Sequence, residues 1–369
     1  KSVLVFLFRE EGEDLFIGPS SMGKALDGDI VRVRLRQRRS RNVRENGRQE
    51  GEVTEIVQRM HTPFVGEVEK GAADAYFLIP DNPRINQEFF IVPKFRKGVK
   101  HGQKALVELL NWDNRSPEVK VIQVLGDAGE NETEMHAILL QYGFTPKFPA
   151  QVEAEAAAIP EEIPAIEYKN RRDFRDSTTF TIDPHDAKDF DDALSLRMLV
   201  NGNLEVGVHI ADVSYYVRPG TELDKEGFER ATSVYLVDRT VPMLPEKLSN
   251  RVCSLRPKEE KLTYSAVFEM TADAEVKNYW IGRTIIYSDH RFTYEGAQDV
   301  LDGTSEGPFK WELDTLDHLA KQLREKRFAR GSVNFHSNEV KFVLDENDKP
   351  IKVVKKVMKD ANFLIEDFM

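Results

Sequence analysis

The sequence has little cysteine and no long apolar run. Among its 369 residues Cys253 is the one cysteine, which excludes an internal disulfide. No window approaches the roughly 18 uninterrupted apolar residues of a membrane-spanning helix, and no signal-like apolar segment is present. These absences predict a soluble protein of the reducing cytoplasm with no membrane partner, and we expect a monomer.

Positive charge is also scarce, since 52 basic residues face 63 acidic ones and the net charge is −11. A uniformly basic surface for nucleic acid is therefore excluded. Residues 32–48 are the exception, with eight arginines against one acid, Glu45. Arg32, Arg34 and Arg36 alternate with apolar residues, which predicts one shared strand face. Two interpretations stay open: a solvated loop, or a hairpin that attracts phosphate groups.

A repeat of 74 residues organises the first third of the chain. The segment Asp14–Pro19 recurs as Glu88–Pro93, and the glycines and valines that follow keep the same offset (Gly28 and Gly102, Val33 and Val107). The repeat length suits one small β-barrel, and the short alternating β-type runs with Gly, Pro and Asn turns agree. We predict two tandem OB-type barrels, over residues 1–58 and 59–126.

Such barrels commonly bind single-stranded nucleic acid by stacking bases on exposed aromatic side chains. Only alternate residues of a strand face outward, so about half of the candidates should belong to the core. The candidates are Phe6, Phe8 and Phe16 in the first copy, and Tyr76, Phe77, Phe89 and Phe90 in the second.

Residues 127–170 are predicted to form an acidic helical connector. Helical patterns span 127–142 and 149–158, and Pro160 and Pro164 end the second helix. The acidic residues of this segment are best explained as a solvated face.

Five aspartates lie within ten positions just after the connector: Asp183, Asp186, Asp189, Asp191 and Asp192. Helix caps or turn residues would account for one or two of them. A calcium-binding loop would require a central glycine and a final glutamate, which this segment lacks. A magnesium site is favoured, because hard carboxylate oxygens hold one or two ions against a substrate phosphate.

The segment after the aspartates predicts a β-hairpin. Apolar residues alternate from Leu194 to Val200 and again from Leu204 to Ile210, around the turn sequence Asn201-Gly202-Asn203. A three-residue loop over 201–203 would pair Leu194 with Ile210 and match every apolar residue. This register would place Asp212 opposite Asp192 and make it a neighbour that shapes the site, with a positive charge close by.

The ordered motifs of the second half resemble those of the ribonuclease II and ribonuclease R family. They are Ile182-Asp followed after five residues by Asp189-Phe-Asp-Asp-Ala193, then Val208-His-Ile-Ala-Asp-Val-Ser214, Thr232-Ser-Val-Tyr-Leu236, Val241-Pro-Met-Leu-Pro245 and Cys253-Ser-Leu-Arg256. The resemblance implies two cold-shock OB domains followed by an α+β RNB catalytic domain, here residues 171–369. It also implies a 3'-to-5' exoribonuclease that hydrolyses single-stranded RNA to nucleoside 5'-monophosphates with Mg²⁺.

The same resemblance implies roles for individual residues. Asp183 and Asp192 would bind the metal directly, Asp189 would support them, and Asp191 would be critical to the chemical step. Tyr235 would stack on the 3'-terminal nucleotide, and Asp186 falls outside the quartet.

The family's Ser-Pro-Ile-Arg-Arg-Tyr segment and its C-terminal OB domain are absent from this sequence. The first OB domain and the RNB domain are expected to be truncated, and the fragment alone to be weak or inactive. Two other functions stay open: a non-catalytic RNA-binding protein and a metal-dependent DNA nuclease.

Overall fold

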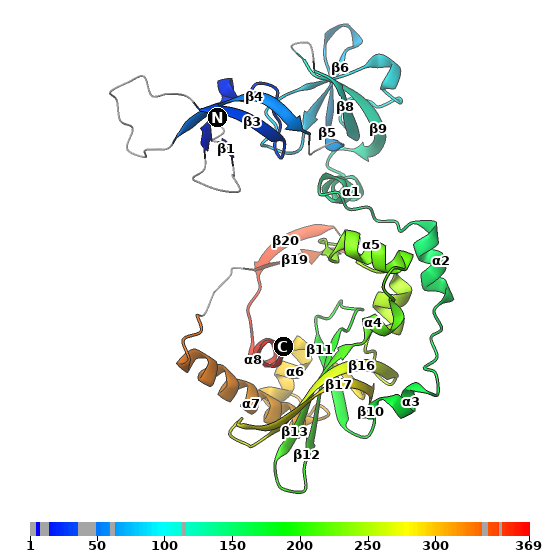
Figure 1. The fold of residues 1–369 in the computed structure, drawn as a ribbon, viewed down its shortest axis with the longest axis vertical. Helices are drawn as coiled ribbons and strands as arrows, with labels where there is room; N and C mark the ends of the chain where they lie inside the picture. Colours follow the sequence, from blue (N-terminus) through cyan, green and yellow to red (C-terminus); the bar gives the residue numbers. More distant parts are fainter. Residues whose placement is uncertain are drawn as a thin grey trace. The chain divides into compact units, whose positions relative to one another are not determined.

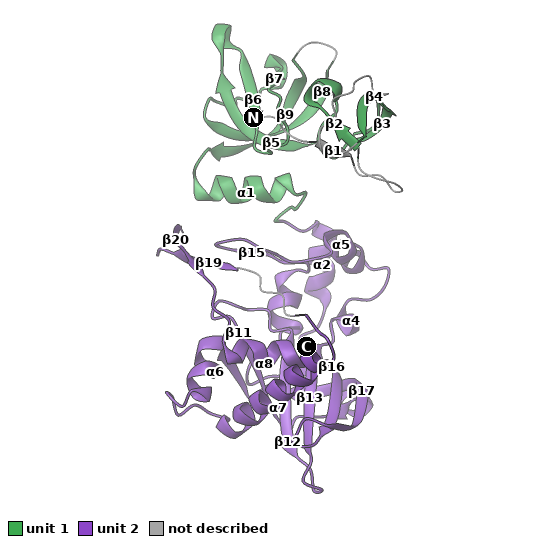
Figure 2. Cartoon of the chain, turned by 90° about the vertical axis from the view of Figure 1, so that its left-hand side faces the viewer, with its two compact units in different colours: residues 1–146 green, residues 147–369 purple. Residues whose placement is uncertain are grey.

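The computed structural model describes residues 5–7, 15–35, 49–59, 63–112, 116–333, 339–346 and 349–369. The chain forms two compact units, residues 1–146 and 147–369 (Figure 2). In the described part of the chain, no helix combines the length and the apolarity needed to cross a membrane.

The first unit begins with a four-stranded sheet in the order β1-β2-β4-β3. Its strands are β1 (Val5–Leu7), β2 (Leu15–Ile17), β3 (Ile30–Leu35) and β4 (Glu50–Gln58). Arg32 and Arg34 are exposed on β3 and form ion pairs with Glu55 and Glu52 of β4, so both charges are partly neutralised. The other arginines of the predicted hairpin, from Arg36 to Arg48, lie outside the described residues.

A closed five-stranded barrel follows, in the order β5-β6-β7-β9-β8 (Figure 1). Its strands are β5 (Phe64–Lys70), β6 (Tyr76–Pro80), β7 (Phe89–Ile91), β8 (Gln103–Asn111) and β9 (Glu118–Asp127). Short 3₁₀ turns lie at η1 (Pro19–Ser21), η2 (Ala72–Asp74) and η3 (Pro93–Phe95). The barrel closes around apolar side chains that include Val68, Leu78, Phe89, Val107 and Val119.

The 74-residue repeat corresponds to a repeated structure. Strands β2 and β7 both bury their first and third residues, both pair in parallel with the last strand of their copy, and both lead into a 3₁₀ turn that starts at the repeated proline. Gly28 and Gly102 both adopt positive φ, 84° and 78°, which a residue with a side chain rarely adopts.

The two helices predicted for the connector are α1 (Asn131–Gln141) and α2 (Ala150–Ala158). Helix α1 packs its Ala137 against Val65 and Leu106 of the barrel. Lys104 of β8 binds Asp81 at 2.8 Å and Glu134 of α1 at 2.6 Å, which ties the helix to the barrel. The boundary between the two units falls at residue 146, inside the predicted connector.

The second unit is built on a seven-stranded sheet in the order β10-β17-β16-β13-β12-β11-β18. These strands are β10 (Arg172–Asp173), β11 (Thr178–Asp183), β12 (Asp192–Met198), β13 (Leu204–Ala211), β16 (Glu260–Met270), β17 (Val276–Tyr287) and β18 (His290–Thr293). Two small two-stranded sheets accompany it: β14 (Val234–Tyr235) with β15 (Thr240–Val241), and β19 (Val340–Leu344) with β20 (Pro350–Lys355).

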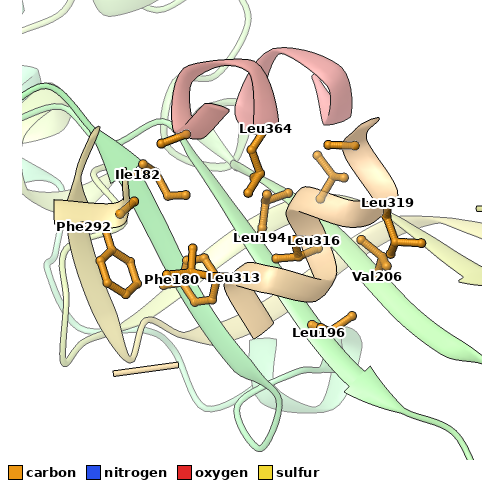
Figure 3. Packing of buried hydrophobic residues seen from close by; sticks show 14 of the residues in the cluster. Phe180, Ile182, Leu194, Leu196, Val206, Phe292, Leu313, Leu316, Leu319 and Leu364 are labelled. Atoms are coloured by element: carbon orange, nitrogen blue, oxygen red, sulfur yellow. The ribbon is translucent and has the colours of Figure 1, made fainter. Parts of the chain in front are cut away.

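Helices cover the two faces of this sheet. On one face, α6 (Tyr294–Leu301), α7 (Lys310–Ala329) and α8 (Asp360–Phe368) bury an apolar core that includes Phe180, Leu194, Leu316 and Leu364 (Figure 3). A second core on the other side is formed with α2, α4 (Val213–Tyr216), α5 (Glu222–Arg230) and a π-helical turn, η4 (Leu248–Val252). Helix α3 (Glu167–Asn170) lies beside β10 and β17 (Figure 1). Along β11–β13 the alternate apolar side chains face the first core, as the sequence pattern predicts, and the opposite side carries small or polar residues such as Thr181, Ser195 and Ala193.

The predicted hairpin register is wrong by two residues. Asp192 pairs with Ile210 and Leu194 with Val208, so Asp212 does not face Asp192. The loop is three residues long as predicted, but it comprises residues 200–202, and Leu199 donates to Asn203 O at 2.8 Å. The reason is Gly202, whose φ of 82° suits the last position of a three-residue loop and not its centre.

Buried polar side chains link the strands on the face of the sheet opposite the apolar core of Figure 3. His209 of β13 contacts Ser195 Oγ at 2.8 Å and Ser265 Oγ at 2.6 Å, and Ser265 and Thr263 both contact Thr284 Oγ1. Burial lowers the pKa of His209 to about 3, so the ring is neutral near pH 7. The imidazole packs over Gly207, where a Cβ would collide with Ser195 Oγ and His209 Nε2.

We predict that Gly207→Ala destabilises the chain by roughly 1 to 3 kcal/mol, because the added methyl group must displace His209 or Ser195. Urea unfolding measures the change. Gly227→Ala, inside α5, is the comparison: its Cβ would approach only Leu244 Cδ2, at 3.3 Å, and helix propensity favours alanine, so its cost should be well below that of Gly207→Ala. Equal stability of Gly207→Ala and wild type would contradict the close packing of His209 on Gly207.

Candidate active site

The predicted quartet of aspartates lies at one edge of the large sheet. Asp183 ends β11 and Asp192 begins β12, and these antiparallel neighbours are joined by a loop that carries Asp189 and Asp191. Ala211, at the end of β13, donates to Asp191 O at 2.9 Å and fixes the end of the loop. Asp186 lies in the same loop with its side chain exposed. Strand pairing therefore gathers Asp183, Asp189, Asp191 and Asp192.

The charges of these side chains interact. Burial raises the pKa of Asp183 to about 7, and the negative charges of Asp192 and Asp189 add to the increase. Loss of hydration among the surrounding residues is the main cause that raises the pKa of Asp191 to about 6, and the negative charges of Asp189 and Asp192 add to it. Asp191 nevertheless stays in contact with solvent. Burial also raises the pKa of Asp192. The folded chain thus holds several carboxyl groups whose ionised forms are disfavoured without a compensating charge.

Tyr235 lies beside this edge, on the short strand β14. Its hydroxyl donates to Asp189 Oδ2 at 2.9 Å, while the side chain is 66% exposed. Partial burial and the hydrogen bond to Asp189 raise the pKa of Tyr235 to about 12, so the phenol is protonated. The structure brings the predicted aromatic residue to the acid quartet with its ring open to solvent.

Asp212 has a different partner from the one predicted. It is buried, and its Oδ2 accepts from Arg171 Nη2 at 2.7 Å while Oδ1 accepts from Ser214 Oγ at 2.9 Å. Arg171 is buried as well and also donates to Thr263 O and Thr284 O. The neighbouring cation of Asp212 is thus Arg171, which also pairs with Glu167 at 2.7 Å, and Arg283 approaches the same Asp212 oxygen at 3.7 Å. An influence of Asp212 on the site stays a prediction.

Sequence reasoning missed two further residues at the quartet. Arg291 of β18 lowers the pKa of Asp183 by its positive charge, and Ser254 hydrogen-bonds to the aspartate loop. Ser254 lies within the Cys253–Arg256 motif, so the sequence marked this segment as part of the family pattern but gave Ser254 no function. Arg291 offered none, because it is more than 100 positions from the loop that it contacts.

The donor chemistry of the quartet suits a hard divalent cation. Asp183 Oδ2 is buried and accepts no hydrogen bond of normal geometry, although the nearby Thr181 hydroxyl lowers the pKa of Asp183; a cation would satisfy this oxygen. Among the described residues, however, no three His, Cys, Asp or Glu side chains converge closely enough to enclose a metal ion. Small side-chain movements of the carboxylates would therefore have to accompany cation binding.

The aromatic candidates of the second barrel separate into core and surface. Phe89 is fully buried, whereas Phe77 and Phe90 are half-buried neighbours on β6 and β7 with ring centres 5.7 Å apart. Tyr76 is half-buried and contacts the guanidinium of Arg96 at 4.2 Å. In the first copy Phe16 is half-buried, and the side chain of Phe6 and all of Phe8 lie outside the described residues.

Three family models match the chain: the Ribonuclease B OB domain over residues 6–56, the Cold shock domain over 77–149, and the RNB domain over 171–369. The RNB model alone covers more than half of the sequence. The chain belongs to the RNB domain family. The match confirms the resemblance and, with the closed barrel, the predicted fold class of OB-fold domains followed by an RNB domain.

Relatives within this family share most of the chain. Ribonuclease R of Thermotoga maritima is 39% identical over 86% of this chain, a match that covers 46% of the relative. The structure of Mycoplasma genitalium RNase R in complex with ribose methylated single-stranded RNA matches with a TM-score of 0.88 at 26% identity, over 96% of this chain and 56% of that one. An Arabidopsis thaliana relative named inactive exonuclease DIS3L2 is 38% identical over 71% of this chain and 26% of its own length. The chain spans about half the length of the Thermotoga and Mycoplasma proteins.

We predict that Asp183→Asn stabilises the cation-free chain at pH 8. The pKa of Asp183 is about 7 when folded, against about 3.9 in an unfolded chain, so ionisation opposes folding as the pH rises through this window. The variant should gain roughly 1 to 4 kcal/mol at pH 8 and nothing near pH 4, by urea unfolding in EDTA. Asp186→Asn, at an exposed position in the same loop, should leave the free energy of unfolding unchanged at both pH 8 and pH 4.

Proposed function

We propose that this protein is a 3'-to-5' exoribonuclease that hydrolyses single-stranded RNA to nucleoside 5'-monophosphates with Mg²⁺. The observation that carries the proposal is the gathering of four aspartates at one sheet edge of an RNB domain, where Asp183 Oδ2 accepts no hydrogen bond of normal geometry. The ribonuclease R names of the relatives and the RNA in the Mycoplasma complex agree with this reaction.

In this proposal, Asp183 and Asp192 bind the cation and Asp189 supports them. A divalent cation in such a site supplies Lewis acidity, which stabilises negative charge on the phosphate and favours a water nucleophile. Asp191 acts on the chemical step, where its carboxylate would take up the proton of the attacking water. Tyr235 presents its exposed ring to the terminal base and uses its hydroxyl to hold Asp189.

The rest of the chain supplies RNA contacts. We assign residues 1–58 and 59–126 to the two OB domains, 127–170 to the connector and 171–369 to the RNB domain. Phe77 and Phe90 of the second barrel form a half-exposed aromatic pair suited to stacking on unpaired bases. Monomeric state and cytoplasmic location stay predictions.

A non-catalytic RNA-binding protein is the second candidate. The Arabidopsis relative that is named inactive favours it, because that protein is 38% identical to this chain and yet carries the name of an inactive enzyme. The complete aspartate quartet favours catalysis, since a protein that only binds RNA gains nothing from four mutually repelling carboxylates.

We predict that Asp191→Asn lowers the rate of magnesium-dependent mononucleotide release at least about 100-fold, because the loss of a general base typically costs this much. The measurement uses uniformly labelled single-stranded RNA, which releases labelled mononucleotides from the 3' end, and the full-length protein. Asp186→Asn makes the same chemical change in the same loop and should keep the wild-type rate. Equal degradation by wild type and Asp191→Asn would reject the assignment, and no degradation by wild type would favour the binding protein. Faster cleavage of a matching DNA strand would favour a DNA nuclease.

We predict that Tyr235→Ala weakens binding of single-stranded RNA about 5- to 100-fold, since one stacked base contributes roughly 1 to 3 kcal/mol. Tyr235→Phe keeps the ring and should bind RNA as wild type does. Fluorescence anisotropy in EDTA separates binding from cleavage. Tyr279→Ala removes a tyrosine of the same 66% exposure on β17 and should have no effect. A loss of affinity in Tyr235→Phe as large as in Tyr235→Ala would show that the hydroxyl, and not stacking, matters.

A further inference from the structure

The loop that carries Asp189 and Asp191 is held from outside at two places. The first is at its beginning, next to Asp183. Arg291, on the neighbouring strand β18, donates from Nη2 to His185 O at 2.9 Å and also to Pro184 O. Its guanidinium lies 5.4 Å from the ring centre of Phe190, at the other end of the loop. One side chain thus contacts both ends of the segment between Asp183 and Asp191.

The second place surrounds Asp189. The hydroxyl of Ser254 accepts from Phe190 N at 3.0 Å and donates to Lys188 O at 2.9 Å. Leu255 N donates to Phe190 O at 2.8 Å. Ser254 is fully buried, so no water replaces these bonds if the hydroxyl is lost. A single hydroxyl therefore bridges the backbone on both sides of Asp189.

These contacts oppose a specific force. Asp189, Asp191 and Asp192 lie within four positions of one another, next to Asp183 at the end of β11, and ionised carboxylates that repel one another would spread an unrestrained loop. A cation would then have to gather the ligands again at the expense of binding free energy. Ligands held in place before the cation arrives avoid this loss.

We propose that Ser254 and Arg291 are positioning residues that hold the aspartate loop in the geometry that binds the cation. This inference rests on the proposed function, because it assumes that the quartet binds a divalent ion. Ser254 holds Asp189 and Asp191 through Lys188 and Phe190, and Arg291 holds the segment that follows Asp183. Neither side chain touches the reacting atoms.

Arg291 gives a test in which positioning and charge predict opposite signs. The titration is made at a pH well above the pKa of Asp183, so that this carboxyl is ionised in both proteins. If Arg291 acted only through its positive charge, Arg291→Met would then remove repulsion and tighten cation binding. If it positions the loop, Arg291→Met weakens binding, and Arg291→Lys, which keeps the charge but loses the two-acceptor geometry, restores only part of the affinity.

The probe is Mn²⁺, titrated into the full chain without RNA and followed by calorimetry. Ser254→Ala and Arg291→Met should each weaken Mn²⁺ binding about tenfold, which corresponds to about 1.4 kcal/mol. The amide hydrogen of Phe190 should exchange faster in Ser254→Ala, in EDTA as well as with Mn²⁺. Ser288→Ala is the matched control: Ser288 is equally buried but its hydroxyl has no partner, so cation affinity and Phe190 exchange should not change.

The outcomes separate this inference from the proposed function. Wild-type affinity in both variants, with unchanged exchange at Phe190, would overturn the inference and leave the cation site intact. Tighter binding by Arg291→Met would overturn the role of Arg291. Absence of Mn²⁺ binding by the wild-type chain would overturn both the cation site and its positioning. If Ser254→Ala does not fold, Arg291→Met and Arg291→Lys decide.

Discussion

Repulsion between ionised carboxylates is the constraint that organises the RNB domain. Four aspartates share one edge of the sheet, and burial makes their charges more costly than they would be in water. The fold bears this cost because the strands that carry the acids are held by two cores and by the central β13. The packing of the sheet offsets the free-energy cost of holding these carboxylates together, which remains unfavourable until a positive charge binds.

Much of this arrangement was predictable because it depends on local patterns. Alternating apolar residues predicted the two strands of the hairpin, Leu194–Val200 and Leu204–Ile210. The 74-residue offset predicted two copies of one barrel motif. The aspartate cluster was recognisable because hard ligands so close together have few other uses. The strands and the aspartate cluster depend on neighbours within about ten positions, and the repeat is recognised because each copy carries the same short local pattern.

The failures came from long-range contacts and from one loop. Arg171 lies 41 positions before Asp212, and nothing in the local pattern linked the two. Ser254 lies 64 positions after Phe190, and its importance depends on burial that only the folded chain shows. The hairpin register failed because matching every apolar residue ignored the backbone of Gly202. Val200 lies exposed in the loop, and Met198 pairs with Leu204 with its side chain largely exposed.

The two-residue error in that hairpin also describes a freedom of the fold. Because side chains alternate with a period of two, the predicted and observed registers bury the same faces and differ only by a slide of about 7 Å along the strand. The loop around Gly202 is therefore a place where the chain tolerates a gain or loss of two residues while both cores stay intact. A register shift of one residue would instead exchange the apolar face with the polar network around His209, so the fold distinguishes odd register shifts from even ones.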